Sequence, residues 1–248
     1  MNSLDVLKFE NAIRKGSKSF AVASLFFSKE EKISAWKLYS WCRYCDDEID
    51  EATDSVEARK RLNILITETN QLGMNHSFDK FQMQGMSEVM QTYLIPKKYP
   101  LDLLIGMQMD VTGIRFRILN DLEEYCYCVA GTVGLMMCHI LGIKSDDALT
   151  HAVSLGGAMQ LTNICRDIHE DHLKGRFYLP LTLLEDSGIT ENGIFESQHQ
   201  GVLIEIQEKL LMRADELYQE GYQGLKYLSL RSSWAVLIAA KMYSHIGS

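Results

Sequence analysis

The sequence predicts an all-α protein with one domain over residues 1–248. Only 3 of the 248 residues are proline, so long stretches lack the residue that breaks helix interiors. Apolar residues recur at helical spacing, as in Leu62, Leu65 and Ile66. No low-complexity tract, fixed-period repeat or linker-like composition divides the chain. Together these features predict one helical bundle large enough to bury a substantial core.

The helical spacing predicts where individual helices lie. Ser28, followed by Glu30 and Glu31, is typical of an N-cap with acidic residues in the first turn. Loops are expected at 73–78, 95–100 and 190–201. The expected helices cover about 28–50, 54–72, 77–94, 100–112, 120–142, 146–172, 198–224 and 230–246.

Composition and charge exclude several classes of protein. Hydrophobic residues make up 46% and charged residues 23%, which is typical of a globular protein. The net charge of −8 argues against a nucleic-acid partner. The longest apolar run, 129–143, is shorter than the ~20 residues needed to span a bilayer. Residues 1–15 do not resemble a secretory leader, so we expect a cytoplasmic protein, with peripheral contact to the inner face of the membrane as a further expectation.

The six cysteines are expected to be free thiols in a reducing compartment. The pairs Cys42–Cys45 and Cys126–Cys128 could be read as a zinc site, although their spacing fits no common zinc finger. His169 and His172 offer a second zinc interpretation, but no third nitrogen or sulfur ligand is apparent near them. Small packing residues and solvent-facing histidines are the competing interpretations.

Several glycines fall inside predicted helices, where each costs roughly 1 kcal/mol relative to alanine. They are Gly131, Gly134, Gly156 and Gly157. One interpretation is that they permit close packing between helices. The other is that they leave room for a bulky apolar ligand between helices.

Two acidic segments carry the candidate chemistry. Asp46 and Asp50 are four residues apart, on one helix face and near a helix C-terminus, where both like-charge repulsion and the helix dipole disfavour them. Asn163, Asp167 and Asp171 follow the same spacing, and Gln160 lies a turn earlier.

Each acidic segment also contains an arginine, Arg43 or Arg166. Carboxylate and amide oxygens are the ligands that Mg²⁺ prefers. Either segment alone could be a solvated acidic surface. Two segments of matched spacing instead indicate two facing sets of ligands with a diphosphate between them.

The order of the motifs resembles the squalene/phytoene synthase family, nearer its phytoene and dehydrosqualene synthase branch. Five segments carry the resemblance along nearly the whole chain: 17–20 (SKSF), 39–50 (YSWCRYCDDEID), 127–134 (YCVAGTVG), 160–171 (QLTNICRDIHED) and 175–180 (GRFYLP). The resemblance implies the isoprenoid-synthase helical bundle with a central apolar cavity.

The resemblance also implies the reaction. Two prenyl diphosphates, farnesyl or geranylgeranyl, would condense head to head (1′–1) through a cyclopropylcarbinyl diphosphate to a C₃₀ or C₄₀ hydrocarbon of the dehydrosqualene or phytoene type. We expect Mg²⁺ as cofactor, with Mn²⁺ as an alternative ion, and no NADPH, because no dinucleotide fingerprint is apparent. The alternative is a catalytically inactive family member that serves as an assembly or interaction protein.

Residue roles follow from the matched motifs. The expected metal ligands are Asp46, Asp50, Asn163, Asp167 and Asp171. The expected catalytic residues are Tyr39, Arg43, Tyr127, Gln160 and Arg166, and the two tyrosines could instead be structural. The expected diphosphate-binding residues are Ser17, Ser19, Arg43, Arg176 and Tyr178.

Two departures from the family pattern and one surface feature complete the expectations. Gly16 stands where dehydrosqualene synthase-like relatives often have histidine. The sequence ends sooner than family members usually do, so we expect part of one cavity wall and of the diphosphate contacts to differ. Leu25, Phe26 and Phe27 precede a helix cap and could dock weakly on a membrane, or could pack into the core instead.

Overall fold

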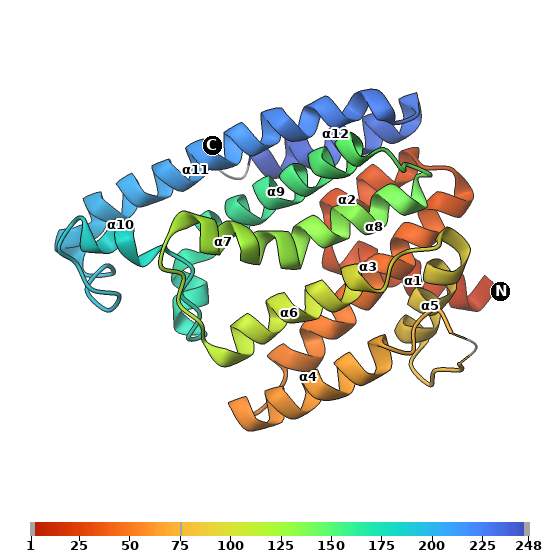
Figure 1. Cartoon of the computed structure of the whole chain (residues 1–248), viewed down its shortest axis with the longest axis horizontal. Helices are drawn as coiled ribbons and strands as arrows, with labels where there is room; N and C mark the ends of the chain where they lie inside the picture. The colour runs from red at the N-terminus through yellow and green to blue at the C-terminus, as the bar shows by residue number, and fades with distance from the viewer. Residues whose placement is uncertain (1–2, 75, 246–248) are drawn as a thin grey trace.

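The computed structural model describes residues 3–74 and 76–245, which fold into stacked helices with no strand among them. Figure 1 shows α4 along one edge of the molecule and α11 and α12 along the opposite edge. No helix among the described residues is both long enough and apolar enough to cross a membrane. The main helices are α1 (Ser3–Gly16), α2 (Lys18–Ala23), α3 (Lys29–Asp50), α4 (Ser55–Thr69), α5 (Phe81–Tyr93), α6 (Lys98–Thr112), α7 (Leu119–Cys126), α8 (Thr132–Ile140), α9 (Asp146–Leu173), α11 (Gln200–Tyr222) and α12 (Leu230–Ser244).

The N-terminus of α3 is fixed by a capping box. The hydroxyl of Ser28 accepts from the backbone N–H of Glu31 at 3.3 Å, and the Glu31 carboxylate accepts from the backbone N–H of Ser28 at 2.8 Å. The cap predicted from the sequence is therefore confirmed. Helix α6 begins at Lys98, before the predicted start, because Pro100 is tolerated in a first helical turn.

Helices at the N-terminus were not predicted. In α1, Phe9 and Ile13 are buried against Trp36 of α3. Ser17 caps α2 by accepting from the backbone N–H of Phe20 at 3.3 Å. The short helix α10 (Leu181–Glu185) and the 3₁₀ turns η1 (Ser24–Phe26), η3 (Ser197–His199) and η4 (Gln223–Tyr227) were also not predicted. Their apolar patterns are too short to show a helical period.

The predicted helix over 120–142 is interrupted by a π-helical turn, η2 (Tyr127–Gly131), between α7 and α8. A π-helical turn places one extra residue in a helix and rotates the residues on its two sides relative to each other. Such turns are frequent at functional sites. Here η2 packs against both α6 and α9.

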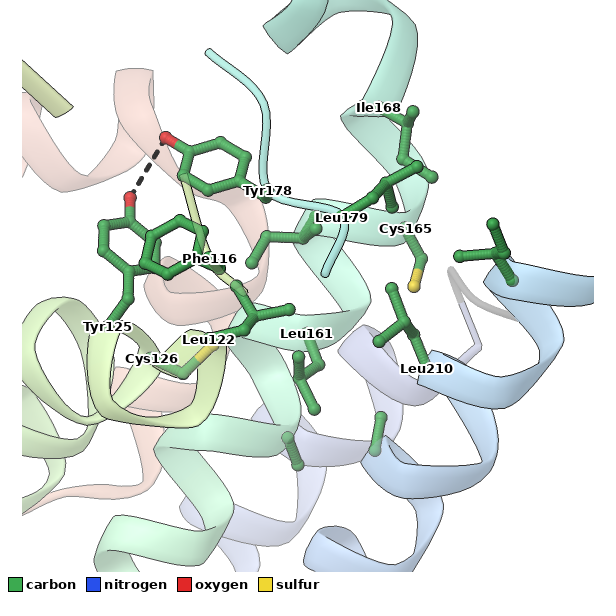
Figure 2. Packing of buried hydrophobic residues seen from close by; sticks show 14 of the residues in the cluster. Phe116, Leu122, Tyr125, Cys126, Leu161, Cys165, Ile168, Tyr178, Leu179 and Leu210 are labelled. Atoms are coloured by element: carbon green, nitrogen blue, oxygen red, sulfur yellow. Dashed lines mark hydrogen bonds between the residues drawn. The ribbon is translucent and has the colours of Figure 1, made fainter. Parts of the chain in front are cut away.

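Two buried clusters hold the bundle together. One joins α3, α4, α5, α6 and α8 around Trp41, which is fully buried. The other joins α7, α9 and α11 with the segment after α9, and Figure 2 shows part of it around Leu161 and Cys165. Helix α9 packs against α8, η2 and α11, so its central turns lie inside the molecule.

Glycines allow the backbones of α8, η2 and α9 to approach closely. A Cβ atom added at Gly156 would lie 2.6 Å from the carbonyl oxygen of Ala130, and one at Gly134 would lie 2.6 Å from that of Ala152. Both glycines also line an apolar cavity. The two interpretations of these glycines, close packing and room for a ligand, therefore both apply to Gly134 and Gly156.

Candidate active site

An acidic cavity of about 250 Å³ lies between the C-terminal end of α3 and the second half of α9. The two acidic segments predicted to face each other do so, since both contribute side chains to this one cavity. From α3 come Asp46 and Asp50, and from α9 come Gln160, Asn163, Arg166, Asp167 and Asp171. Arg176 and Tyr178, from the segment after α9, complete the wall together with Asp110 of α6 and Tyr125 of α7.

The donor set of the cavity fits a hard divalent ion. Its candidate ligands would be carboxylate oxygens together with Oδ1 of Asn163, an amide oxygen that is buried and accepts no hydrogen bond from any described residue. The Asn163 Nδ2 donates weakly, at 3.5 Å, to Gln160, which leaves Oδ1 for another partner. Within the described part of the chain, no three His, Cys, Asp or Glu side chains are grouped closely enough to hold a metal ion.

Arginines pair with carboxylates around this cavity. The Arg176 guanidinium lies 2.5 Å from Oδ1 of Asp50 and so connects the segment after α9 to α3. Arg166 lies 2.5 Å from its neighbour Asp167. Arg43, on α3, pairs with Asp47 at 2.7 Å, and its side chain is half exposed. The expected arginines are thus at or near the site, although Arg43 does not line the cavity.

The pKa values of two of the carboxylates are raised. The loss of surrounding water raises the pKa of Asp46 to about 7, and Arg43 opposes this rise. The loss of water also raises the pKa of Asp171 to about 6, with the neighbouring Asp167 adding to the shift. A bound cation would favour the charged form of both groups.

A hydrogen-bonded group of three residues forms the floor of the cavity. The hydroxyls of Tyr178 and Tyr125 lie 2.7 and 3.0 Å from the two carboxylate oxygens of Asp110, and 3.1 Å from each other. Figure 2 shows the two tyrosines meeting from different elements beside Phe116. Burial raises the pKa of Asp110, and Arg176 and the two hydroxyls oppose that rise.

A second, apolar cavity of about 330 Å³ adjoins the acidic one. The two share Val129, Gln160 and Asn163 as a common wall. The apolar cavity extends from this wall to Ile143, Tyr227 and Leu228 at the ends of other elements, and most of its lining side chains are apolar. A ligand with a charged head and a long apolar tail fits this pair of cavities.

Tyr39 lies in the apolar cavity, as do Phe20 and Tyr243. Burial raises the pKa of Tyr39 to about 12, so its hydroxyl stays neutral, and Arg43 opposes the shift. Gly16 makes this position possible, because a Cβ atom there would lie 2.1 Å from the Tyr39 hydroxyl. The glycine that departs from the family pattern is therefore matched to the position of Tyr39.

Comparison with known proteins indicates the same family as the sequence motifs do, over nearly the whole chain. Residues 13–248 match the family model described as squalene/phytoene synthase. The chain belongs to the squalene/phytoene synthase family. It is 40% identical over 240 residues to a 15-cis-phytoene synthase of Enterobacter agglomerans, covering 94% of this chain and 81% of that protein.

Two further comparisons agree with this assignment. A 15-cis-phytoene synthase of Pantoea ananas is 38% identical over 240 residues, covering 94% of this chain and 78% of the other. The crystal structure of a dehydrosqualene synthase superposes with a TM-score of 0.88 at 31% identity, covering 97% of this chain and 84% of that one.

Family membership confirms the fold and the enzyme class predicted from the sequence. The all-α isoprenoid-synthase fold and a prenyltransferase that joins two prenyl diphosphates head to head are both supported. The inactive alternative is not favoured. The squalene/phytoene synthases are a group of enzymes that depend on a divalent metal and act on prenyl diphosphates.

The structure places one of the expected catalytic tyrosines outside both cavities. Tyr127, the first residue of the family's central tyrosine–glycine signature, lines neither cavity, and its hydroxyl instead donates to Asp102 at 2.8 Å and lies beside Lys98. Tyr125 faces the acidic cavity in its place. Residues two apart on a helix point in different directions, so only one of the two tyrosines can reach the site.

Two more side chains near the cavities were missed by the sequence analysis. Tyr243 stacks on Phe20 with ring centroids 5.3 Å apart, and burial raises its pKa while a hydrogen bond with Ser17 opposes the rise. Asp110 lies in helix α6, which also carries Asp102, and no spacing pattern in the sequence marks it as facing a cavity. Ser17 thus lies beside the apolar cavity, and Ser19 is half-buried in the same short helix.

The zinc interpretations find no support in the geometry. Cys45 and Cys126 are buried in different hydrophobic clusters, and all six cysteines are free. His172 stacks on Phe195 with ring centroids 4.2 Å apart, and His169 packs against the same ring. These residues are packing elements.

Proposed function

We propose that this enzyme condenses two molecules of geranylgeranyl diphosphate head to head and releases a C₄₀ hydrocarbon of the phytoene type. The observation that carries the proposal is the wall shared by the acidic and apolar cavities. A diphosphate in the acidic cavity has its prenyl tail directed past Gln160 and Asn163 into the apolar one. The named function of the 15-cis-phytoene synthases, which are 38–40% identical, supports a C₄₀ product.

The acidic cavity binds the leaving group. Mg²⁺, for which Mn²⁺ is a plausible substitute, would be held by Asp46, Asp50, Asn163, Asp167 and Asp171 and would neutralise the charge that builds up on the departing diphosphate. Arg43, Arg166 and Arg176 add fixed positive charge beside the phosphate oxygens. Ser17, Ser19 and Tyr178 supply hydroxyl donors to the diphosphates.

The apolar cavity protects the reactive intermediate. Loss of diphosphate leaves an allylic cation, which the double bond of the second prenyl chain attacks, and loss of a proton from that chain then closes the ring of a cyclopropylcarbinyl diphosphate. Departure of the second diphosphate, rearrangement of the cation and loss of a second proton give the hydrocarbon. Apolar walls exclude the water that would trap these cations. The faces of Tyr39 and Tyr243 stabilise positive charge by cation–π contact. Gln160, in the shared wall, and Tyr125 orient the diphosphate end.

Product analysis tests the proposal. The purified protein is supplied with Mg²⁺ and either farnesyl or geranylgeranyl diphosphate, each with and without NADPH, and the extracts are analysed by mass spectrometry. We expect a C₄₀ hydrocarbon from geranylgeranyl diphosphate, unchanged by NADPH. A C₃₀ product alone would assign the shorter substrate, a product that requires NADPH would add a reductive step, and the absence of any condensed product would remove the enzymatic function.

We further propose weak peripheral docking on the inner face of the membrane, because the apolar product must leave water. Each buried CH₂ favours transfer out of water by ~0.8 kcal/mol. Leu25 and Phe26 are 61% and 41% exposed, whereas Phe27 lines the apolar cavity. Leu230 and Trp234 of α12, the helix packed on η1, are 77% and 53% exposed. The exposed side chains at this end of the apolar cavity would meet lipid.

Liposome flotation tests the docking proposal. We expect the double variant Leu25→Ser with Phe26→Ser to lose flotation with phosphatidylcholine liposomes while its Tm stays unchanged. The matched control is Val56→Ser with Ile64→Ser, which replaces two exposed apolar residues of α4 at the opposite edge of the molecule (Figure 1). Equal flotation of the two variants would remove the docking surface from this end of the cavity.

A further inference from the structure

Arg176 lies among four carboxylates that come from three helices. Its guanidinium contacts Asp50 at 2.5 Å, and it interacts electrostatically with Asp46, Asp110 and Asp171. The side chain is 24% exposed, so much of it is removed from water. Without this positive charge the four carboxylates would face one another across a poorly hydrated cavity.

The position of Arg176 conflicts with metal binding at Asp50. A carboxylate oxygen 2.5 Å from a guanidinium is engaged in a charge-assisted hydrogen bond. A divalent cation on the same carboxylate would bring two positive groups together at short range, where repulsion between like charges is strong. A cation bound through Oδ1 would have to displace the guanidinium, and one bound through Oδ2 would still lie within a few ångströms of its positive charge.

The backbone around Arg176 is anchored, whereas its side chain has room to move. The backbone N–H of Arg176 donates to the carbonyl of Asp171 at 2.9 Å, and Gly175 takes the left-handed conformation (φ +77°) that ends α9. Phe177 and Tyr178 are buried directly after it. The guanidinium itself lines the cavity of about 250 Å³, so a change of rotamer can carry it from Asp50 to another anion in that cavity.

We propose that Arg176 is a built-in counter-cation, which pairs with Asp50 when no metal ion is bound there and moves to the diphosphate when the metal ion binds Asp50. The inference rests on the proposed function, because it assumes that metal and diphosphate enter the acidic cavity. An arginine that only contacted the diphosphate would have no effect on metal binding to the substrate-free protein, whereas Arg176 is expected to have one. Arg176 opposes metal binding in the absence of diphosphate and supports diphosphate binding in the presence of metal.

The test measures metal and pyrophosphate binding separately, without prenyl substrate or turnover. Binding of Mn²⁺ to the substrate-free protein is followed by electron paramagnetic resonance, and binding of inorganic pyrophosphate at saturating Mg²⁺ by calorimetry. In Arg176→Gln we expect Mn²⁺ binding to tighten about five- to tenfold, a coupling of ordinary size between sites. Pyrophosphate binding should weaken by about the same factor or more.

Two controls make the result specific. Arg213→Gln removes an arginine that is 28% exposed, comparable to Arg176, and ion-paired with Glu123 on the α7 side of the bundle; it should change neither affinity. In an Asp50→Asn background, Arg176→Gln should tighten Mn²⁺ binding by less than about twofold, because the competition at Asp50 is already absent.

Each outcome decides the proposal. Unchanged or weaker Mn²⁺ binding in Arg176→Gln overturns it, as does full tightening in the Asp50→Asn background, which would indicate a general charge effect. If Arg176→Gln does not fold, Arg176→Met takes its place, since methionine also removes the charge while keeping an unbranched side chain, and the same two signs are required. Failure here leaves the condensation activity, measured by product analysis, untouched.

Discussion

At the scale of single residues, the Tyr39 hydroxyl occupies the space that a side chain at position 16 would need. A Cβ at position 16 would overlap the Tyr39 hydroxyl, the far end of a flexible side chain, so the ring can shift without disturbing the fold. We expect Gly16→Ala to lower the rate of condensation about tenfold or more, since a displacement near 1 Å can cost ~10²-fold, while the Tm changes little. The control is Gly201→Ala, where a Cβ meets no atom within 4 Å. An active Gly16→Ala enzyme would show that the position of Tyr39 is not needed.

The four aspartates that α3 and α9 contribute to the acidic cavity are expected to serve function at the expense of stability. Replacing Asp46, Asp50, Asp167 or Asp171 singly by alanine should abolish turnover and leave the Tm equal or slightly higher, because like-charge repulsion is relieved. Asp79→Ala, at an exposed aspartate before α5, is the control. A fall of about ten degrees, on the order of 2–4 kcal/mol for a domain this large, would make the residue structural.

The sequence revealed these aspartates because each pair repeats at helical spacing within one segment. Asp110 and Tyr243 gave no such pattern, because each joins the site only through contacts with elements distant in sequence. Spacing within a helix is visible in a sequence. Contact between helices is not.

At the scale of elements, Tyr125 near the end of α7 lines the acidic cavity, whereas Tyr127 at the start of η2 lines neither cavity. We expect Tyr125→Phe to lower the rate about ten- to hundredfold, the range for loss of a placed hydrogen-bond donor. Tyr127→Phe should change it less than about twofold, because its hydroxyl contacts Asp102 and Lys98 outside both cavities. Steady-state kinetics with the Tm of each variant tests the pair. The opposite ranking would return the catalytic role to Tyr127.

Most helices were predictable to within a few residues, because their apolar periods are long and their ends carry caps. The exceptions have physical reasons. Helix α1 gains its stability from Phe9 and Ile13 packed on α3, which is a tertiary contact. The sequence of η2 has the composition of an ordinary helix, so the extra residue could not be predicted from it. The turn is seen only in the structure, where η2 packs against α6 and α9. The sequence therefore did not show that the hydroxyl of Tyr127, the first residue of η2, contacts Asp102 and Lys98.

At the scale of the whole molecule, metal and diphosphate should bind cooperatively. The carboxylates come from α3 and α9, and described residues offer no group of three His, Cys, Asp or Glu that could hold a metal ion. Diphosphate oxygens would complete the coordination. We expect calorimetry to show pyrophosphate binding at least about tenfold tighter with Mg²⁺ than with EDTA. Equal affinity in the two buffers would contradict a shared metal–diphosphate site.

The stability of the metal-free protein should fall as pH rises, whereas the stability gained from bound Mg²⁺ and pyrophosphate should increase. The pKa values of about 7 for Asp46 and about 6 for Asp171 lie above the ordinary range, so the folded protein binds more protons than the unfolded chain between about pH 4 and 7. The contribution of these two groups to the free energy of unfolding of the metal-free protein therefore falls as pH rises from 5.5 to 8. Metal binding requires the deprotonated carboxylates and so strengthens over the same interval.

Thermal unfolding at pH 5.5 and pH 8 measures this reversal. The increase in Tm on adding Mg²⁺ and pyrophosphate should be larger at pH 8 than at pH 5.5. The double variant Asp46→Asn with Asp171→Asn, which cannot titrate at either position, should show the same small increase at both pH values. A wild-type increase that is equal at the two pH values would assign the proton-linked behaviour to other groups.

Under the proposed function, the common wall of Val129, Gln160 and Asn163 would stop the charged end of every substrate at one place. The length of the prenyl chain would then be measured from that fixed origin, and residues elsewhere in the apolar cavity, among them Ile143, Tyr227 and Leu228, would select between shorter and longer chains. The groups that hold the diphosphate and the groups that select the chain would be separate, so each set could change in evolution without the other.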